Sequence, residues 1–168
     1  MKKQLQTRRL VLMALLIALS IVCSRYLAIE LPTMKFSTTF IPNSLMGALF
    51  GPSWGVAGGI LSDLLGIWMN PKSMPYYGFT LSAALIGWIY GICLHRETIR
   101  WKHVIIASAL TNLGVQLFLN TLWIQQLSHV PYWPTFIARV PIEIITMIIQ
   151  AIVLKLLLNL LPLKKWRQ

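Results

Sequence analysis

Acidic residues are almost absent from this sequence, which has only 4 Asp and Glu among 168 residues, against 15 Lys and Arg. Charged residues of both signs make up 11% of the chain, whereas soluble domains have roughly a quarter. Hydrophobic residues make up 57%, and a soluble domain this small leaves too much surface exposed to hide that much apolar area. The composition therefore excludes an ordinary soluble domain and indicates an integral membrane protein.

Cysteines and chemical motifs are also scarce. Cys23 and Cys93 are predicted at different depths in the membrane, which argues against a disulfide, and two scattered thiols make no metal site. The sequence lacks a G-x-x-x-x-G-K-[ST] loop for ATP, an H-E-x-x-H motif, and any repeated filter or ring of charges typical of a channel. We expect a protein that is not an enzyme, without cofactor or metal. An intramembrane hydrolase built on Asp63 and Glu143, or a structural membrane subunit, is the alternative.

Apolar runs separated by helix breakers predict six transmembrane helices, since a span needs about 17 to 25 residues, or fewer where a bundle shields it. Proline and glycine in Pro32, FGPSWG, NPKSMPYYG and HVPYWP mark the joints. We therefore expect one all-α domain, residues 1–168, folded as a compact six-helix bundle. The predicted helices are 10–31, 38–50, 53–69, 78–95, 104–127 and 136–161.

Basic residues predict the orientation of this bundle. The tails and the loop between the fourth and fifth helices hold most of them, whereas the opposite loops have only Lys35 and Lys72. By the positive-inside rule, both termini are cytoplasmic. Because this charge is split among three segments, it does not indicate a nucleic-acid partner. The predicted cytoplasmic set is Lys2, Lys3, Arg8, Arg9, Arg96, Arg100, Lys102, Lys164, Lys165 and Arg167.

Polar side chains from four predicted helices fall at one depth in the outer half of the bundle. Arg25, Asp63, Asn120 and Glu143 each lie about 9 to 10 Å below the outer end of their helix, at 1.5 Å per residue. Arg139 lies one turn above Glu143 on the same face. A charge near the bilayer centre costs about 2.5 to 3.5 kcal/mol unless it is paired or hydrated. These residues therefore need partners, water or a ligand.

Two interpretations of this polar layer remain open. In one, Arg139 pairs with Glu143 and Arg25 with Asp63, and the pairs only lock the bundle. In the other, the layer lines a water-filled cavity that opens to the outside and binds a polar solute. Aromatic residues near the outer loops could form an interfacial belt or flat walls for a planar ring. They are Tyr76, Tyr77, Phe79, Trp123, Tyr132 and Trp133.

Several stretches of the chain resemble a known transporter family. Ala14 and Ala18 form a small-xxx-small face where another helix can approach closely. Together with six short helices, the stretches IPNSLMGALFGPSWGVAGGILSDLLG and PYYGFTLSAALIGWIYG resemble the substrate-binding (S) components of group-II energy-coupling factor (ECF) transporters. Among these, the sequence is most similar to the folate-specific S components.

The resemblance implies a folate-binding subunit in the bacterial cell membrane. Such a subunit captures its vitamin outside and docks through Ala14 and Ala18 on a transmembrane coupling subunit that works with two cytoplasmic ATPase subunits. An S component for another vitamin or a modified nucleobase is the alternative within the family.

The charges in the outer half of the bundle suit folate chemically. A carboxylate accepts two neighbouring N–H groups of a pterin, and we expect Asp63, ahead of Glu143, in this role. The glutamate tail of folate has two carboxylates, so Arg25 and Arg139 are expected to hold it or to brace the acid. Further expected contacts are ring walls from Tyr76, Tyr77, Phe79 and Trp133, and hydrogen bonds from Thr80, Ser82 and Asn120.

Overall fold

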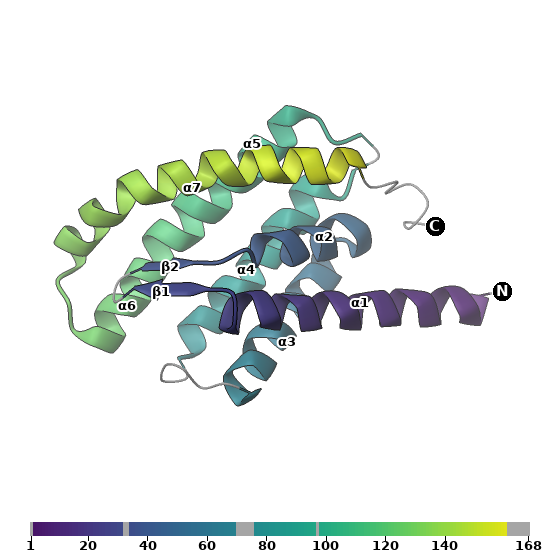
Figure 1. Ribbon diagram of the computed structural model, residues 1–168, viewed down its shortest axis with the longest axis horizontal. Helices are drawn as coiled ribbons and strands as arrows, with labels where there is room; N and C mark the ends of the chain where they lie inside the picture. Colours follow the sequence, from purple (N-terminus) through teal and green to yellow (C-terminus); the bar gives the residue numbers. More distant parts are fainter. Residues whose placement is uncertain (1, 32–33, 70–75, 97, 161–168) are drawn as a thin grey trace.

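The computed structural model describes residues 2–31, 34–69, 76–96 and 98–160 as a helical bundle (Figure 1). The described residues form six helical segments, as predicted. Every segment after the first begins and ends within four residues of its predicted bounds. The elements are α1 (Lys2–Arg25), β1 (Ile29–Leu31), β2 (Met34–Phe36), α2 (Phe40–Phe50), α3 (Pro52–Met69), α4 (Tyr77–Leu94), the continuous rod α5 (Trp101–Ala109), η1 (Leu110–Leu119) and α6 (Asn120–Ser128), and α7 (Tyr132–Leu160).

The first helix differs most from its prediction. Helix α1 begins at Lys2 and ends at Arg25, so the predicted end at residue 31 was wrong. The following residues instead form an antiparallel hairpin in which Ile29 pairs with Phe36 and Leu31 with Met34. Pro32 contributes to this change, because it drives the residue before it, Leu31, out of the helical conformation into an extended one.

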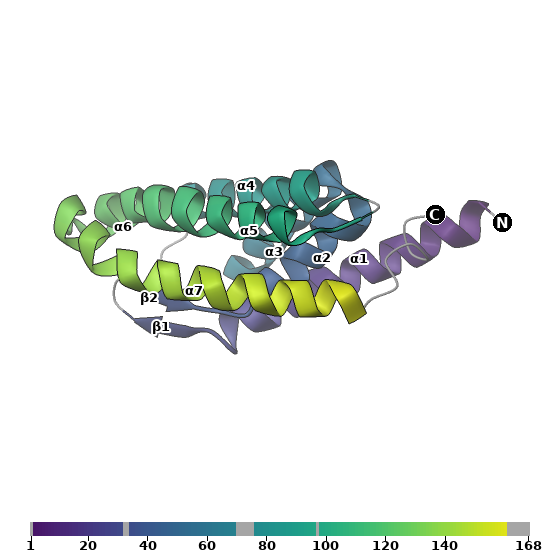
Figure 2. The same cartoon turned by 90° about the horizontal axis from the view of Figure 1, so that it is seen from above.

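The start of α1 and the end of α7 lie toward the same end of the bundle, and the β1–β2 hairpin lies at the opposite end (Figures 1 and 2). We call the end with the start of α1 the basic end, and the end with the β1–β2 hairpin the hairpin end. The basic end holds Arg8, Arg9, Arg96, Arg100 and Lys102. Helices Thr7–Arg25, Tyr77–Leu94, Trp101–Ser128 and Tyr132–Leu160 are long and apolar enough to cross a membrane, and α2 is a shorter apolar helix.

The short helix α2 fills the interior at the basic end. Its 11 residues span only about 16 Å, and they pack against α1, α3, α4 and α7. Helix α2 ends at Phe50 and is capped by Gly51, whose φ of 87° allows the sharp turn into α3. Because α2 is short, the apolar core is confined to the basic-end half of the bundle. This core consists of Met13, Leu16, Met46, Ala48, Leu49, Tyr90, Leu94, Val104, Ala107, Ala151, Leu154 and Leu158.

Helices α3 and α4 pack backbone to backbone through a pair of glycines. A Cβ on Gly87 would lie 2.1 Å from the carbonyl oxygen of Gly55, and a Cβ on Gly55 would lie 2.4 Å from that of Gly87. Small residues at such a crossing let the two helices approach until their backbones touch. This contact holds α3 and α4 as one rigid unit, and both helices contribute side chains to the polar layer.

Candidate functional site

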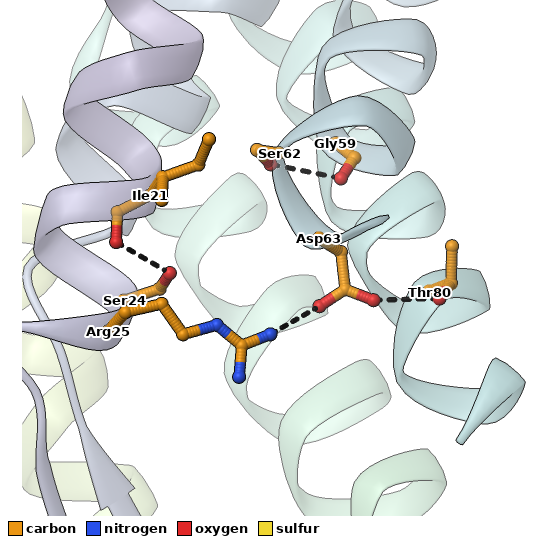
Figure 3. Close-up of polar contacts among 7 residues, drawn as sticks. All are labelled: Ile21, Ser24, Arg25, Gly59, Ser62, Asp63 and Thr80. Atoms are coloured by element: carbon orange, nitrogen blue, oxygen red, sulfur yellow. Dashed lines mark hydrogen bonds and ion pairs between the residues drawn. The ribbon is translucent and has the colours of Figure 1, made fainter. Parts of the chain in front are cut away.

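A cluster of polar side chains joins α1, α3 and α4 near the hairpin end (Figure 3). Asp63 on α3 accepts a hydrogen bond of 2.7 Å at Oδ2 from the hydroxyl of Thr80 on α4. Its other oxygen, Oδ1, lies 3.7 Å from an Nη of Arg25, the last residue of α1. The carboxylate of Asp63 thus bridges a neutral donor and a guanidinium that come from two other helices.

The contact between Arg25 and Asp63 leaves hydrogen-bonding capacity unused. A separation of 3.7 Å is too long for a hydrogen bond, so the pair is held by charge alone. Nε of Arg25 is buried and has no hydrogen-bond partner among the described residues. The side chain of Asp63 is 19% exposed. Both groups can therefore bind a further polar molecule without first giving up a protein hydrogen bond.

A second ion pair lies within α7. Arg139 donates a hydrogen bond of 3.0 Å to Glu143 one turn later, and another of 3.3 Å to Thr121 on α6. Its Nε, like that of Arg25, is buried without a partner among the described residues. On the neighbouring rod, Asn120 donates to Gln116, while its own carbonyl oxygen is buried and unpartnered in the same part of the chain.

The interior of the bundle changes character between its two ends. The apolar core lies in the basic-end half and also has buried polar neighbours such as Ser108, Asn112 and Gln150, whereas both buried arginines lie toward the hairpin end. A buried polar atom without a partner costs about 1 to 3 kcal/mol, so several in one region indicate a place that a polar ligand or water completes. The buried polar residues toward the hairpin end are Arg25, Ser62, Ser82, Thr121, Thr135 and Arg139.

Aromatic rings flank this region where α4 begins and α6 runs. The ring of Tyr76 lies 6.1 Å from that of Phe79 and 5.8 Å from that of Trp123, between centroids. Tyr76 donates to Gln126, and the indole N–H of Trp123 donates a 3.1 Å hydrogen bond to Ser82. These contacts tie the start of α4 to α6 and fix the orientation of the rings.

Comparison with known proteins places the chain in a family. Residues 8–158 match the family described as ECF transporter, substrate-specific component. The chain belongs to this family. A curated relative, Folate transporter FolT of Clostridium novyi (strain NT), is 35% identical over 145 residues, which cover 86% of this chain and 84% of the relative. Folate transporter FolT of Leuconostoc mesenteroides is 30% identical over 144 residues, with 84% and 77% covered.

A solved structure agrees with this placement. The chain is similar to one described as "Crystal structure of FolT bound with folic acid", with a TM-score of 0.87 and 35% identity. The match covers 91% of this chain and 93% of the other. The six-helix bundle and the membership in the ECF S components that the sequence predicts are thus confirmed.

This S component brings together some predicted site residues and not others. Asp63 contacts Arg25 and Thr80, and Arg139 contacts Glu143, so both ion pairs of the structural interpretation are present. The unpartnered nitrogens of both arginines favour the ligand-binding interpretation instead. The predicted place of Arg25 inside a helix was wrong, because α1 ends at this residue and Arg25 is not one to two turns before the helix end.

Two predicted aromatic contacts lie away from these polar groups. Tyr77 is 88% exposed and Trp133 is 69% exposed, whereas Tyr76 and Phe79 are partly buried. Tyr77 is the first residue of α4, whereas Tyr76, which precedes the helix in an extended conformation, contacts Trp123. Exposed positions of this kind fit the interfacial belt better than the wall of a binding site.

Three residues with direct contacts in this region were missed by the sequence reasoning. Gly66 lies beneath Arg25, Thr121 receives a hydrogen bond from Arg139, and Gln116 pairs with Asn120. Gln116 and Asn120 are four residues apart, a spacing that puts them on one helix face, so this pair had a usable signal. Gly66 and Thr121 had none, because their roles depend on which partner helix lies opposite.

One sequence motif typical of hydrolases lacks the local structure that such an enzyme needs. Residues 51–55 read GPSWG, which has the letters of the G-x-S-x-G nucleophile motif. That motif needs a strand before the serine, whereas Ser53 follows helix α2 and is the second residue of α3. The nearby His95 is bonded through Nδ1 to the backbone carbonyl of Ala48 at 3.0 Å.

Proposed function

We propose that this chain is the folate-binding S component of an ECF-type importer in a bacterial cell membrane. The observation that carries the proposal is its similarity, at a TM-score of 0.87 and 35% identity, to the structure described as FolT bound with folic acid. The relatives named Folate transporter FolT support the same vitamin. Folate enters from the hairpin end, where both buried arginines lie, and the basic end faces the cytoplasm.

The carboxylate of Asp63 is proposed to bind the pterin head of folate. A pterin presents a ring N–H and an exocyclic amine side by side, and a carboxylate accepts both. Oδ2 of Asp63 has one hydrogen bond from Thr80, and Oδ1 has no direct hydrogen bond from Arg25. The carboxylate therefore keeps acceptor capacity on both oxygens while its position is fixed. The partly buried rings of Tyr76, which caps α4, and of Phe79, which precedes Thr80 on that helix, can pack on the ligand.

The two buried arginines are proposed to serve different purposes. Arg25 keeps an unpartnered Nε and only a loose contact with Asp63, so it can hold a carboxylate of the glutamate tail or steady Asp63. Arg139 already makes two hydrogen bonds, to Glu143 and Thr121. It braces α7 against α6 and offers its remaining Nε to the ligand. Asn120, with its unpartnered carbonyl oxygen, adds an acceptor beside this pair.

Energy for transport is proposed to come from partner subunits. The sequence has no nucleotide-binding loop, so the S component depends on a transmembrane coupling subunit and two cytoplasmic ATPase subunits. Ala14 and Ala18 are both exposed on α1, one turn apart. Their small side chains leave a shallow face where a helix of the coupling subunit can approach closely.

The ligand that copurifies with the protein tests the vitamin directly. The full-length protein is purified in mild detergent from cells grown with folate, denatured, and its released small molecules are identified by mass spectrometry. We expect folate or a reduced folate at about one per protein. Equilibrium binding of radiolabelled folate, with thiamin and riboflavin as competitors, measures selectivity. Release of a different vitamin that folate fails to displace would overturn the folate assignment and leave the S-component class intact.

A further inference from the structure

The basic end of the bundle has a pocket that lies outside the proposed folate site and docking face. It is an open pocket of about 360 Å³ between α4 and α5, lined by Arg96, Thr98, Arg100, Lys102 and His103. Three of these five residues are permanently cationic. Glu97, which lies in the same loop by sequence, is outside the described residues, and the loop still has an excess of positive charge.

Neighbouring side chains place this pocket at the level of the lipid headgroups. Trp101 begins α5 directly beside the pocket and is 51% exposed, and tryptophan is the residue that marks the membrane–water interface. Ile105 and Ile106, one turn deeper on α5, are exposed where acyl chains would lie. Lys155 of α7 donates a 2.7 Å hydrogen bond to the carbonyl of Ile99, and its Nζ lies 6.0 Å from the centre of the Trp101 ring. A fourth cation is therefore fixed at the same level.

The backbone at the start of α5 adds to the positive potential. The rod from Trp101 to Ser128 is 28 residues long and begins at this pocket, so the positive end of its dipole lies there. Within the first turn, Nδ1 of His103 accepts a 3.2 Å hydrogen bond from the backbone N–H of Arg100. This bond fixes the backbone at the pocket rim and does not involve the guanidinium of Arg100.

We propose that this pocket binds the phosphate group of an anionic phospholipid, such as phosphatidylglycerol, from the cytoplasmic leaflet. The cations contact the phosphate, and the acyl chains lie along Trp101, Ile105 and Ile106. In both views α5 lies on a different side of the bundle from α1, which has the proposed docking face (Figures 1 and 2). The lipid site is therefore separate from the proposed docking face on α1. The basic pocket, and not the positive-inside bias alone, accounts for this binding.

Titration with defined lipids tests the proposal. The full-length protein in detergent is titrated with phosphatidylglycerol or phosphatidylcholine, and bound lipid is counted by native mass spectrometry. We expect phosphatidylglycerol to bind selectively, and the double variant R100Q/K102Q to weaken this binding about 25- to 30-fold, at about fivefold per basic residue near the membrane surface. The matched variant R8Q/R9Q removes two charges from the same end outside the pocket, and should bind lipid and folate as the parent does.

Several outcomes would overturn the proposal. Equal loss in both variants would mean that lipid follows net charge and not the pocket. Full displacement of the lipid by millimolar inorganic phosphate or glycerol 3-phosphate would mean a small-anion site. Normal lipid binding by R100Q/K102Q, combined with poorer copurification of the ATPase module, would assign the pocket to a protein partner. Folate binding by R100Q/K102Q is expected to be unchanged, which separates this test from that of the transport function.

Discussion

The guanidinium of Arg25 lies directly on the helix surface at Gly66. A Cβ placed on Gly66 would come within 2.9 Å of Nε and 3.4 Å of an Nη of Arg25. Gly66 is on α3, three residues after Asp63, so glycine and carboxylate lie on the same face of the helix. The stretch DLLG therefore encodes both the acid and the space that lets a buried arginine from α1 reach it.

Replacing Gly66 by Ala is expected to weaken folate binding without harming the fold. The new methyl pushes the flexible end of Arg25 away, and the backbone stays in place. Alanine also favours a helix by about 0.5 to 1 kcal/mol over glycine, which preserves stability. We expect about a tenfold rise in the Kd for folate, or about 1.4 kcal/mol, measured by equilibrium binding. Gly114→Ala is the matched control, because nothing lies within 4 Å of its added Cβ.

Asp63→Asn should separate ligand binding from structural bracing. Asparagine keeps an oxygen for the 2.7 Å hydrogen bond from Thr80, so α3 and α4 stay joined. It loses the charge, and a hydrogen bond to a charged group is worth about 1.5 to 3 kcal/mol. We therefore expect folate affinity to fall about 10- to 100-fold, with a nearly unchanged thermal midpoint. A large drop in the midpoint together with normal affinity would assign Asp63 to bracing alone.

The helices were largely predictable from the sequence, because prolines and glycines mark their ends. Helix α3 was predicted as 53–69 and is Pro52–Met69, since the FGPSWG turn begins it. The hairpin after α1 was missed because residues 26–31 are mostly apolar and Glu30 among them was taken into the helix, and hydropathy alone does not distinguish a helix from a strand. Pro32 and the alternation of apolar and charged residues in IEL (29–31) and MKF (34–36) were the available signals of the change.

The polar partners were predictable in part. Glu143 and Arg139 were predictable as a pair because they are four residues apart on one helix. The contact of Arg25 with Asp63 followed from matched charge and approximate depth, although the depth of Arg25 rested on a wrong helix end. Thr121 and Gly66 depend on which helix faces which, and a single sequence does not contain that information. The roles of these residues toward folate stay predictions.

The ion pair on α7 is expected to contribute stability more than affinity. Arg139→Met leaves Glu143 in a largely buried position without its cation, and breaking a buried pair costs about 3 to 5 kcal/mol. We expect a marked drop in the thermal midpoint of the detergent-solubilised protein. The double variant R139M/E143L should recover most of that loss, because it removes both charges. If the double variant is no more stable than R139M alone, the two residues are not coupled.

A second polar network in the bundle interior should affect stability alone. Asn112 donates a 2.7 Å hydrogen bond to Gln150, which in turn donates to the hydroxyl of Tyr90, and all three residues are buried. Gln150→Leu leaves the Tyr90 hydroxyl without this partner, at a cost of about 1 to 3 kcal/mol. We expect a lower thermal midpoint with folate affinity within about twofold of the parent. Gln125→Leu, at an exposed position on α6, is the control and should leave both quantities unchanged.

Ala14→Trp tests the docking face on α1. Ala14 is exposed, so a bulky ring there disturbs no internal packing, but it prevents another helix from approaching closely. We expect the variant to bind folate normally in detergent, to lose copurification with the coupling and ATPase subunits, and to lose folate uptake in cells. Leu110→Trp places the same ring at an exposed position on η1 and should retain uptake. Normal uptake by Ala14→Trp would place the coupling contact elsewhere on the bundle, because no helix could pack closely over an indole at that position.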